Sequence, residues 1–160
     1  FITSGRLGTM GFGTGAAIGA QFALPEARIV HIAGDGSFRM NCNELATIAH
    51  YKLPIVIVIV NNGALGNVRM WQRLFYGKRF SQTTLDFGPD WIKLADAYGI
   101  KGYRTSNAKE FAKVFDEAFK SQKPAVIDAK VDMDEMVLPM VPGGKPIFNQ
   151  IMNLSEEIMN

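Results

Sequence analysis

The stretch from Ile55 to Val60 limits the fold most, because its six residues are alternately isoleucine and valine, without a polar residue. Successive side chains of a β-strand point to opposite faces of the sheet, so a strand made from this run is apolar on both faces. Such strands lie inside parallel sheets that helices cover on both sides. The apolar run from Leu53, broken by Pro54, is also far shorter than the ~20 residues of a membrane-spanning helix. We therefore expect a buried strand and no membrane partner.

Helical and strand patterns alternate along the rest of the chain. Apolar, β-branched runs predict strands, and apolar residues at helical spacing predict helices. The predicted strands cover 28–33, 55–60 and 125–131. The predicted helices cover 11–23, 43–51, 65–75 and 90–98. A last predicted helix begins after a cap at Ser106 or Asn107 and ends near Phe119. Strands that alternate with helices are joined by right-handed crossovers into parallel sheets. The predicted class is α/β, an open parallel sheet with helices on both faces.

The chain of 160 residues has the length of one ordinary domain. The segment from Leu138 is rich in Pro and Gly, which favours irregular structure. We therefore predict a domain over 1–137 and a C-terminal arm over 138–160 that packs on it. Because the sequence opens without Met and soon reaches a glycine-rich segment, we expect it to belong to a larger protein.

Charge and cysteine content narrow the partners and the compartment. The net charge is +2, and the densest basic cluster, Lys78-Arg79, is isolated, so we expect no nucleic-acid partner. Cys42 is the single cysteine and cannot form an internal disulfide, which favours a reducing compartment, the cytoplasm or an organelle matrix; we expect the cytoplasm. His31 and His50 are the only histidines, and their positions favour structural roles.

Polar residues follow two of the predicted strands. Gly34-Asp35-Gly36 and Ser37 come after the strand at 28–33, and Asn61-Asn62 comes after the strand at 55–60. Ligands of open parallel sheets bind at the carboxyl ends of the strands, where helix N-termini attract anions. Glycines let the backbone approach a phosphate, and carboxylate and amide oxygens suit Mg²⁺. The pattern predicts a site for a diphosphate and its divalent metal.

Each cluster by itself is more often a turn, because Gly, Asp and Asn commonly serve there. The two clusters together favour the binding site, since 24 residues separate Gly36 from Asn61 and a helix and a strand fill that interval.

Gly34-Asp35-Gly36, the following 24 residues and Asn61-Asn62 together resemble the thiamine-diphosphate-binding motif. Three further segments resemble, in order, the C-terminal domain of the catalytic (large) subunit of acetolactate (acetohydroxyacid) synthase. They run from Thr3 to Gly13, from Trp71 to Tyr76 and from Leu138 to Lys145. The resemblance covers nearly the whole chain. It implies the thiamine-diphosphate-binding fold, with thiamine diphosphate and Mg²⁺ as cofactors.

The resemblance also implies which residues hold the metal and the diphosphate. Asp35, Asn62 and the carbonyl of Ala64 would be the metal ligands. The residues that would surround the diphosphate are Gly34, Gly36, Ser37, Leu65, Gly66 and Asn67.

Three residues would lie around the thiamine part of the cofactor, and a fourth would lie in the substrate pocket. By resemblance, Met10 would support its bent form, the Gly8 carbonyl would face the aminopyrimidine, and Val68 would pack on that ring. Trp71 would line the pocket of the second 2-keto acid. Residue type alone favours core packing for Met10 and Val68, and leaves Trp71 balanced between core and function. Arg6 departs from the family, which commonly has Gly there, and puts the local loop conformation in question.

The implied activity is the decarboxylation of pyruvate and its condensation with pyruvate or 2-oxobutyrate, in branched-chain amino acid biosynthesis. In this family the catalytic glutamate comes from an N-terminal domain of a neighbouring subunit. The FAD site lies largely in a middle domain. We therefore expect a homodimer or larger homo-oligomer with the active site at the subunit interface, a possible small regulatory subunit, and no activity from this chain alone. No catalytic acid or base is assigned within it.

Three alternatives stay open at this point. Gly11, Gly13 and Ala16, with Asp35 further on, match a loose dinucleotide fingerprint, although no predicted strand precedes them. Another thiamine enzyme, such as a pyruvate oxidase, a decarboxylase or a sulfoacetaldehyde acetyltransferase, would share the metal motif. A degenerate structural or regulatory copy is disfavoured, because both side-chain metal ligands are present.

Overall fold

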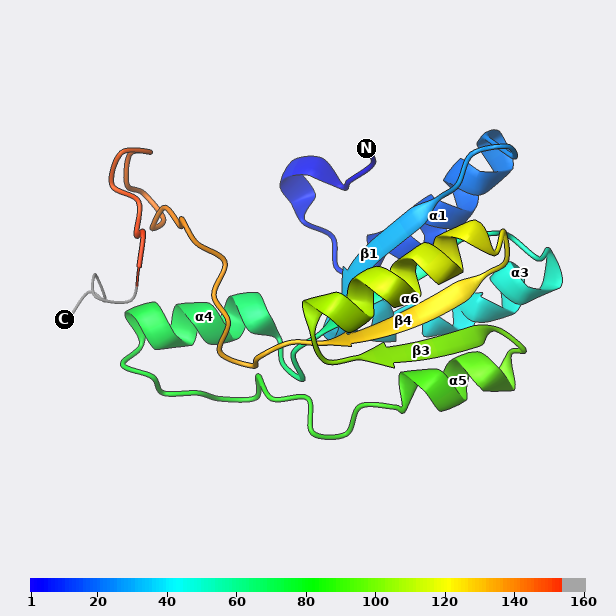
Figure 1. Ribbon diagram of the computed structural model, residues 1–160. Coiled ribbons are helices and arrows are strands. Elements are labelled where there is room, and N and C mark those ends of the chain that lie inside the picture. Colours follow the sequence, from blue (N-terminus) through cyan, green and yellow to red (C-terminus); the bar gives the residue numbers. More distant parts are fainter. Residues whose placement is uncertain (154–160) are drawn as a thin grey trace.

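The computed structural model describes residues 1–153, which form an open sheet of four parallel strands with helices on both faces (Figure 1). The strands are β1 Val30–Gly34, β2 Val56–Asn61, β3 Lys101–Thr105 and β4 Ala125–Lys130. Their order across the sheet is β1-β2-β4-β3. The predicted α/β class and the parallel sheet are confirmed.

Strand β2 lies inside the sheet, as its composition predicts. It pairs with β1 on one side and β4 on the other, so that Ile57 is opposite both His31 and Val126. Its side chains from Val56 to Ile59 are all at most 4% exposed. Burial on both faces explains why no polar residue interrupts this run.

Helices lie on both faces of the sheet (Figure 1), and a separate cluster of buried apolar residues holds them on each face. One face, with Ile55, Ile57 and Ile59, is covered by α1 Phe12–Ala23, α2 Asp35–Arg39, α3 Leu45–His50 and α5 Trp91–Ala97. The other face, with Val56, Val58 and Ile127, is covered by α6 Ala108–Lys120. Two 3₁₀ turns complete the elements, η1 Gly5–Leu7 and η2 Cys42–Glu44.

Two elements of the structure were not predicted from the sequence, and one predicted helix is divided. Strand β3 was missed because it carries Lys101, Gly102 and Arg104 and pairs only with β4, so an edge position tolerates its polar sequence. Helix α2 was missed because its five residues are too few for a periodic pattern. The predicted helix over 43–51 is divided into η2 and α3.

The two candidate caps of α6 have different roles. The Asn107 side chain accepts a hydrogen bond from the Glu110 N–H at 3.0 Å and is the N-cap. The Ser106 N–H and hydroxyl instead donate to the Glu110 carboxylate, so that Glu110 binds the residue that precedes the N-cap.

Helix α4, Gly66–Phe75, lies away from the faces of the sheet and beside the C-terminal segment (Figure 1). Its buried residues Met70 and Leu74 pack with Ile151 and with apolar residues between 136 and 140. Met140 and Ile151 also form an antiparallel bridge. The rest of the predicted arm, 154–160, lies outside the described residues, and its boundary at 138 stays a prediction. No helix within 1–153 combines the length and apolar character needed to cross a membrane.

Candidate functional site

The two polar clusters meet at neighbouring strand ends. Gly34, the last residue of β1, is opposite Val60 of β2, so the segments that follow both strands begin at the same edge of the sheet. Asp35 starts α2 directly after β1, whereas a short loop with Asn62 and Ala64 leads from β2 to α4. The order of neighbouring strands thus creates the site that spacing alone only suggested.

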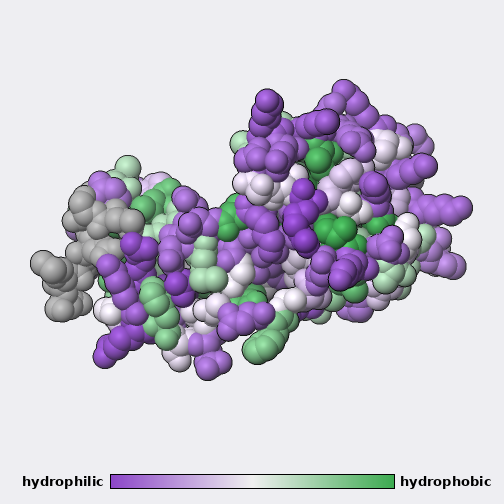
Figure 2. Space-filling view, turned by 60° about the horizontal axis from the view of Figure 1, so that its bottom comes forward, coloured by the Kyte–Doolittle hydropathy of each residue, from purple (hydrophilic) through white to green (hydrophobic). Residues whose placement is uncertain are grey.

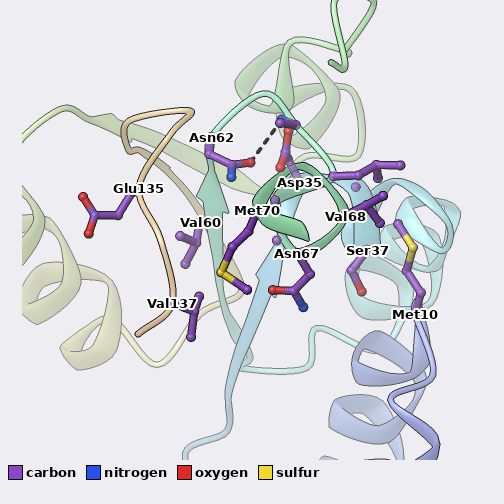
Figure 3. Close-up of a pocket in the computed structure, with 15 residues that line it drawn as sticks. Met10, Asp35, Ser37, Val60, Asn62, Asn67, Val68, Met70, Glu135 and Val137 are labelled. Atoms are coloured by element: carbon purple, nitrogen blue, oxygen red, sulfur yellow. Dashed lines mark hydrogen bonds between the residues drawn. The ribbon is translucent and has the colours of Figure 1, made fainter. Parts of the chain in front are cut away.

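A cavity of about 420 Å³ lies at this edge (Figure 3). All the predicted cofactor residues except Gly8 line it, namely Met10, Gly34, Asp35, Gly36, Ser37, Asn62, Ala64, Leu65, Gly66, Asn67 and Val68. Gly8 lies outside this lining, in the turn that ends η1. The structure therefore brings together predicted residues up to 58 positions apart in the sequence, from Met10 to Val68.

Asp35 places a buried carboxylate in the lining of the cavity. Its side chain is only 5% exposed, and its Oδ1 has no hydrogen-bond partner among the described residues. Burial raises the pKa of Asp35, although the N–H groups of Gly36 and Gly63 and the charge of Lys130 oppose that rise. A divalent cation at Oδ1 would remove this cost of burial.

The loop after β2 offers neutral oxygens beside this carboxylate. The Asn62 Oδ1 accepts a hydrogen bond from the Ala64 N–H at 3.1 Å (Figure 3). Backbone bonds from Leu65 to Thr83 and from Leu85 to Gly63 hold the loop against a second segment. No group of three acidic, His or Cys side chains in the described chain could hold a metal alone. This donor set fits Mg²⁺, which commonly uses one or two carboxylates together with phosphate oxygens.

Two glycines keep space open in the cavity. A Cβ on Gly36 would lie 2.9 Å from Leu65 Cδ2 and 3.1 Å from Met10 Cε. A Cβ on Gly66, the first residue of α4, would lie 2.7 Å from Asn62 Nδ2. No described side chain caps the start of α4, so its first N–H groups are available to an anion.

Ser37 connects the diphosphate side of the cavity to the segment that carries Met10. Its Oγ accepts a hydrogen bond from the Gly11 N–H at 3.0 Å, which leaves its hydroxyl hydrogen free to donate to a ligand. Met10 is 44% exposed and Val68 is 47% exposed, so core packing, which their residue types favoured, is wrong for this chain. Both side chains instead form apolar walls of the cavity.

Trp71 lies on the outer side of α4. Its side chain is 54% exposed, and it lines a neighbouring cavity with Val68, Gln72, Tyr76 and Arg79. The buried side of α4 is formed by Met70 and Leu74 instead, so the core role that was open for Trp71 is excluded. Because Val68 lines both cavities, Trp71 is next to the predicted cofactor site.

The sequence did not identify four residues of the lining, Val60, Met70, Glu135 and Val137. Val60 could have been found, since it is opposite Gly34 at a strand end. Glu135 and Val137 carry no local signal, because they reach the cavity through the packing of their segment on α4. The Glu135 carboxylate points away from Asp35 (Figure 3).

His31 is structural, as expected. It is 7% exposed, lies 3.2 Å from the Thr14 hydroxyl, and has a pKa lowered by burial. The dinucleotide alternative lacks its required context, because a 3₁₀ turn, and no strand, precedes Gly11 in the described chain.

The site lies at the ends of parallel strands and combines a carboxylate that suits a metal with a helix start that suits an anion. These features are those of a domain that binds the diphosphate of a cofactor, and sequence comparison identifies its class. Residues 1–129 match the family described as the thiamine pyrophosphate enzyme, C-terminal TPP binding domain. The chain belongs to this family.

Particular relatives narrow the class further. The chain is 48% identical over 153 residues to the probable acetolactate synthase large subunit of Methanococcus aeolicus, covering 94% of this chain and 25% of that protein. It is 44% identical over 155 residues to the acetolactate synthase isozyme 2 large subunit of Escherichia coli strain K12, covering 97% and 28%. The chain thus spans about a quarter of the length of the curated relatives it matches.

A solved structure supports the same fold. The thiamine diphosphate-dependent 4-hydroxybenzoylformate decarboxylase of Rhodococcus jostii RHA1 superposes with a TM-score of 0.74 and is 33% identical. The similarity covers 81% of this chain and 24% of that one.

Proposed function

We propose that this chain is the diphosphate-binding part of an acetolactate synthase large subunit. The enzyme decarboxylates pyruvate and joins the remaining two-carbon unit to pyruvate or 2-oxobutyrate, in branched-chain amino acid biosynthesis. The observation that carries the proposal is the buried Oδ1 of Asp35, which has no hydrogen-bond partner within residues 1–153 and lies in a cavity that all but one of the predicted cofactor residues line. The 48% identity to a probable acetolactate synthase large subunit supports the choice among thiamine enzymes.

Each part of the cavity has a task in this proposal. Asp35, Asn62 and the Ala64 carbonyl would hold Mg²⁺, and the first N–H groups of α4 would donate to phosphate oxygens. Met10 and Val68 would exclude water from the apolar side. Thiamine diphosphate, when bound, supplies the nucleophilic carbon and the electron sink for loss of CO₂. Trp71 would contact the second 2-keto acid from the neighbouring cavity.

The surface around the cavity supports an oligomer. Apolar side chains interrupt the polar surface of the chain (Figure 2), and Met10, Val68 and Trp71 are each more than 40% exposed beside the cavity. Groups of exposed apolar residues commonly mark interaction surfaces. We propose that a neighbouring subunit covers them and provides the catalytic glutamate, while FAD and a small regulatory subunit bind elsewhere in a cytoplasmic homodimer or larger assembly. This chain by itself would then be inactive.

Product analysis of the complete protein tests the activity. With pyruvate, thiamine diphosphate, Mg²⁺ and FAD, we expect acetolactate, and a second condensation product once 2-oxobutyrate is added. Asp35→Asn should abolish both, whereas Asp116→Asn should not, because Asp116 pairs with Lys120 on the surface of α6. Release of CO₂ without a condensation product would refute the proposal and favour another thiamine enzyme, such as a pyruvate oxidase. Turnover of sulfoacetaldehyde in place of pyruvate would favour the acetyltransferase.

A further inference from the structure

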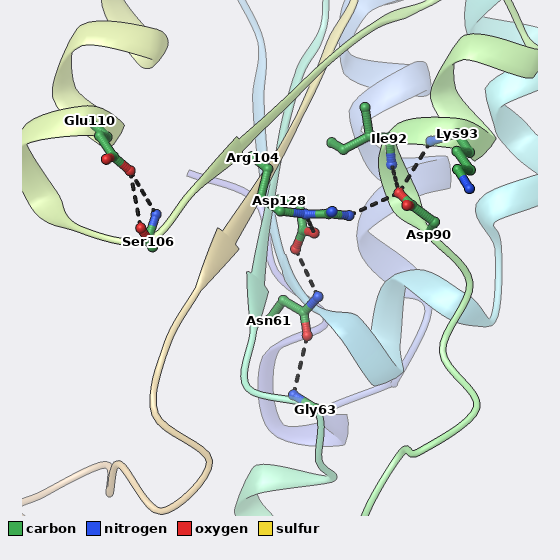
Figure 4. A network of polar contacts seen from close by, with 9 residues as sticks. All are labelled: Asn61, Gly63, Asp90, Ile92, Lys93, Arg104, Ser106, Glu110 and Asp128. Carbon is green, nitrogen blue, oxygen red and sulfur yellow. Dashed lines mark hydrogen bonds and ion pairs between the residues drawn. The ribbon is translucent and has the colours of Figure 1, made fainter.

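A buried carboxylate connects three strands behind the cavity. Asp128 of β4 is 0% exposed, and its two oxygens accept from different partners (Figure 4). Its Oδ1 accepts from Asn61 Nδ2 of β2 at 2.7 Å, and its Oδ2 accepts from Arg104 Nε of β3 at 2.9 Å. Both bonds are charge-assisted, and the bond to Asn61 is buried on both sides, where such bonds are strong and costly to break; the Arg104 side chain is 46% exposed.

This chain of contacts continues at both ends. The Asn61 Oδ1 accepts a hydrogen bond from the Gly63 N–H at 3.2 Å, in the loop that follows β2. At the other end, a second nitrogen of Arg104 donates to Asp90 at 2.8 Å, and Asp90 caps the start of α5. The contact with Asp128 raises the pKa of Arg104.

Asn61 does not belong to the lining of the main cavity, although its neighbour Asn62 does. Its amide points toward Asp128 and Gly63, so its two polar atoms are both used within the protein. Gly63 adopts a left-handed conformation with φ 67°, which allows the sharp turn between Asn62 and Ala64. The amide of Asn61 therefore holds the residue that separates the two proposed metal ligands of this loop.

We propose that Asp128 and Arg104 are positioning residues that act through Asn61 to set the affinity of the site for Mg²⁺. The proposal rests on the function proposed above. Neither residue lines the cavity, and their effect passes through one amide to the backbone of the loop. Groups that orient metal ligands in this way typically change metal affinity by about 10–100-fold when they are replaced.

The variant Asp128→Asn tests this with almost no change in volume. Whichever way the new amide turns, its NH₂ group faces either the Asn61 NH₂ or the Arg104 N–H, so one pair of donors is opposed. The double variant Asn61→Asp with Asp128→Asn exchanges the two groups and removes this conflict. Residue 61 would then accept from both Gly63 and residue 128, and residue 128 would accept from Arg104.

The measurement is the Mg²⁺ concentration that half-saturates thiamine diphosphate binding, followed by intrinsic fluorescence of the complete protein. We expect Asp128→Asn to raise it by about 10–100-fold and the double variant to return it to within about threefold of wild type. Arg104→Lys keeps the charge but loses the geometry of the guanidinium, so we expect a smaller rise of about threefold to tenfold. Asp116→Asn should leave the value unchanged, because its ion pair with Lys120 is on the surface.

Each outcome decides the proposal. If Asp128→Asn and Arg104→Lys lower only the melting temperature and leave the half-saturating Mg²⁺ concentration unchanged, the network is structural and the proposal is wrong. If Asp128→Asn does not fold, Arg104→Lys and the exchanged pair carry the same test. Failure of the proposed function itself would appear differently, as wild-type protein whose binding of thiamine diphosphate does not depend on Mg²⁺.

Discussion

The variant Asp35→Asn should raise the stability of the ligand-free protein while it destroys cofactor binding. In the structure the carboxylate is 5% exposed and one of its oxygens has no partner among the described residues. A buried polar atom left without a hydrogen bond costs about 1–3 kcal/mol, and more when its group is charged. An amide of the same shape carries no charge, so its burial costs less.

The expected gain in unfolding free energy is therefore about 1–3 kcal/mol without ligands. For domains of about 150–250 residues, each kcal/mol shifts the melting temperature by about 2–4 °C. With Mg²⁺ and thiamine diphosphate at about 1,000 times the dissociation constant, wild type gains about 4.1 kcal/mol and the variant gains none. The order of the two melting temperatures should thus invert when the ligands are added.

Thermal unfolding of the complete protein, in EDTA and with saturating ligands, measures both effects. Asp116→Asn is the matched control, because both partners of its ion pair are more than half exposed and exposed pairs contribute little. It should follow wild type in both buffers. A lower melting temperature for Asp35→Asn in EDTA would refute the reasoning, since it would mean that the carboxylate stabilises the empty site.

The pH gives an independent check of the same cause. Because burial raises the pKa of Asp35, the folded protein holds its proton at higher pH than the unfolded chain does. The folded state is thus favoured as the pH falls toward the ordinary carboxyl pKa of about 4. The excess of the unfolding free energy of Asp35→Asn over that of wild type, measured in EDTA, should be largest at neutral pH and should decrease as the pH is lowered. An advantage that does not change with pH would show that the charge is not its source.

Two further pairs of variants test the packing around the site. Gly13→Ala places a Cβ 2.3 Å from the buried His31 ring, so we expect a loss of about 1–2 kcal/mol in unfolding free energy. A Cβ on Gly15 of the same helix meets nothing within 4 Å, so Gly15→Ala should raise the unfolding free energy by up to about 1 kcal/mol. Chemical denaturation measures both changes. Trp71→Ala should change the unfolding free energy by less than about 1 kcal/mol, but it should shift the ratio of the products formed from pyruvate and 2-oxobutyrate. Replacement of the buried Leu74 by Ala should lower the unfolding free energy by about 2–5 kcal/mol. Equal losses for the two glycines, or an unchanged product ratio for Trp71→Ala, would contradict these expectations.

Elements with a strong apolar pattern could be predicted because burial determines their composition. The run in β2 and the apolar stripe of α6 lie in the two layers of the core, as their sequences indicated. Strand β3 could not be predicted, because an edge strand that pairs on one side needs no apolar pattern.

The exposure of α4 was also beyond sequence reasoning. Leu65, Val68, Trp71 and Phe75 have helical spacing, yet the side that is buried is the one with Met70 and Leu74. Which side of a helix faces inward depends on what packs against it, and here that is the segment around Ile151.

Residue type and spacing are enough to specify the chemistry of the site, namely a carboxylate, an amide and glycines at the ends of two strands. Which of the oxygens are available to a ligand depends on the tertiary structure. It leaves Oδ1 of Asp35 without a hydrogen-bond partner among residues 1–153, and it turns Asn61 away from the cavity toward Asp128, 67 residues further along the chain. The physical reason is that strand order brings β4 beside β2, and no local pattern in either strand encodes that contact.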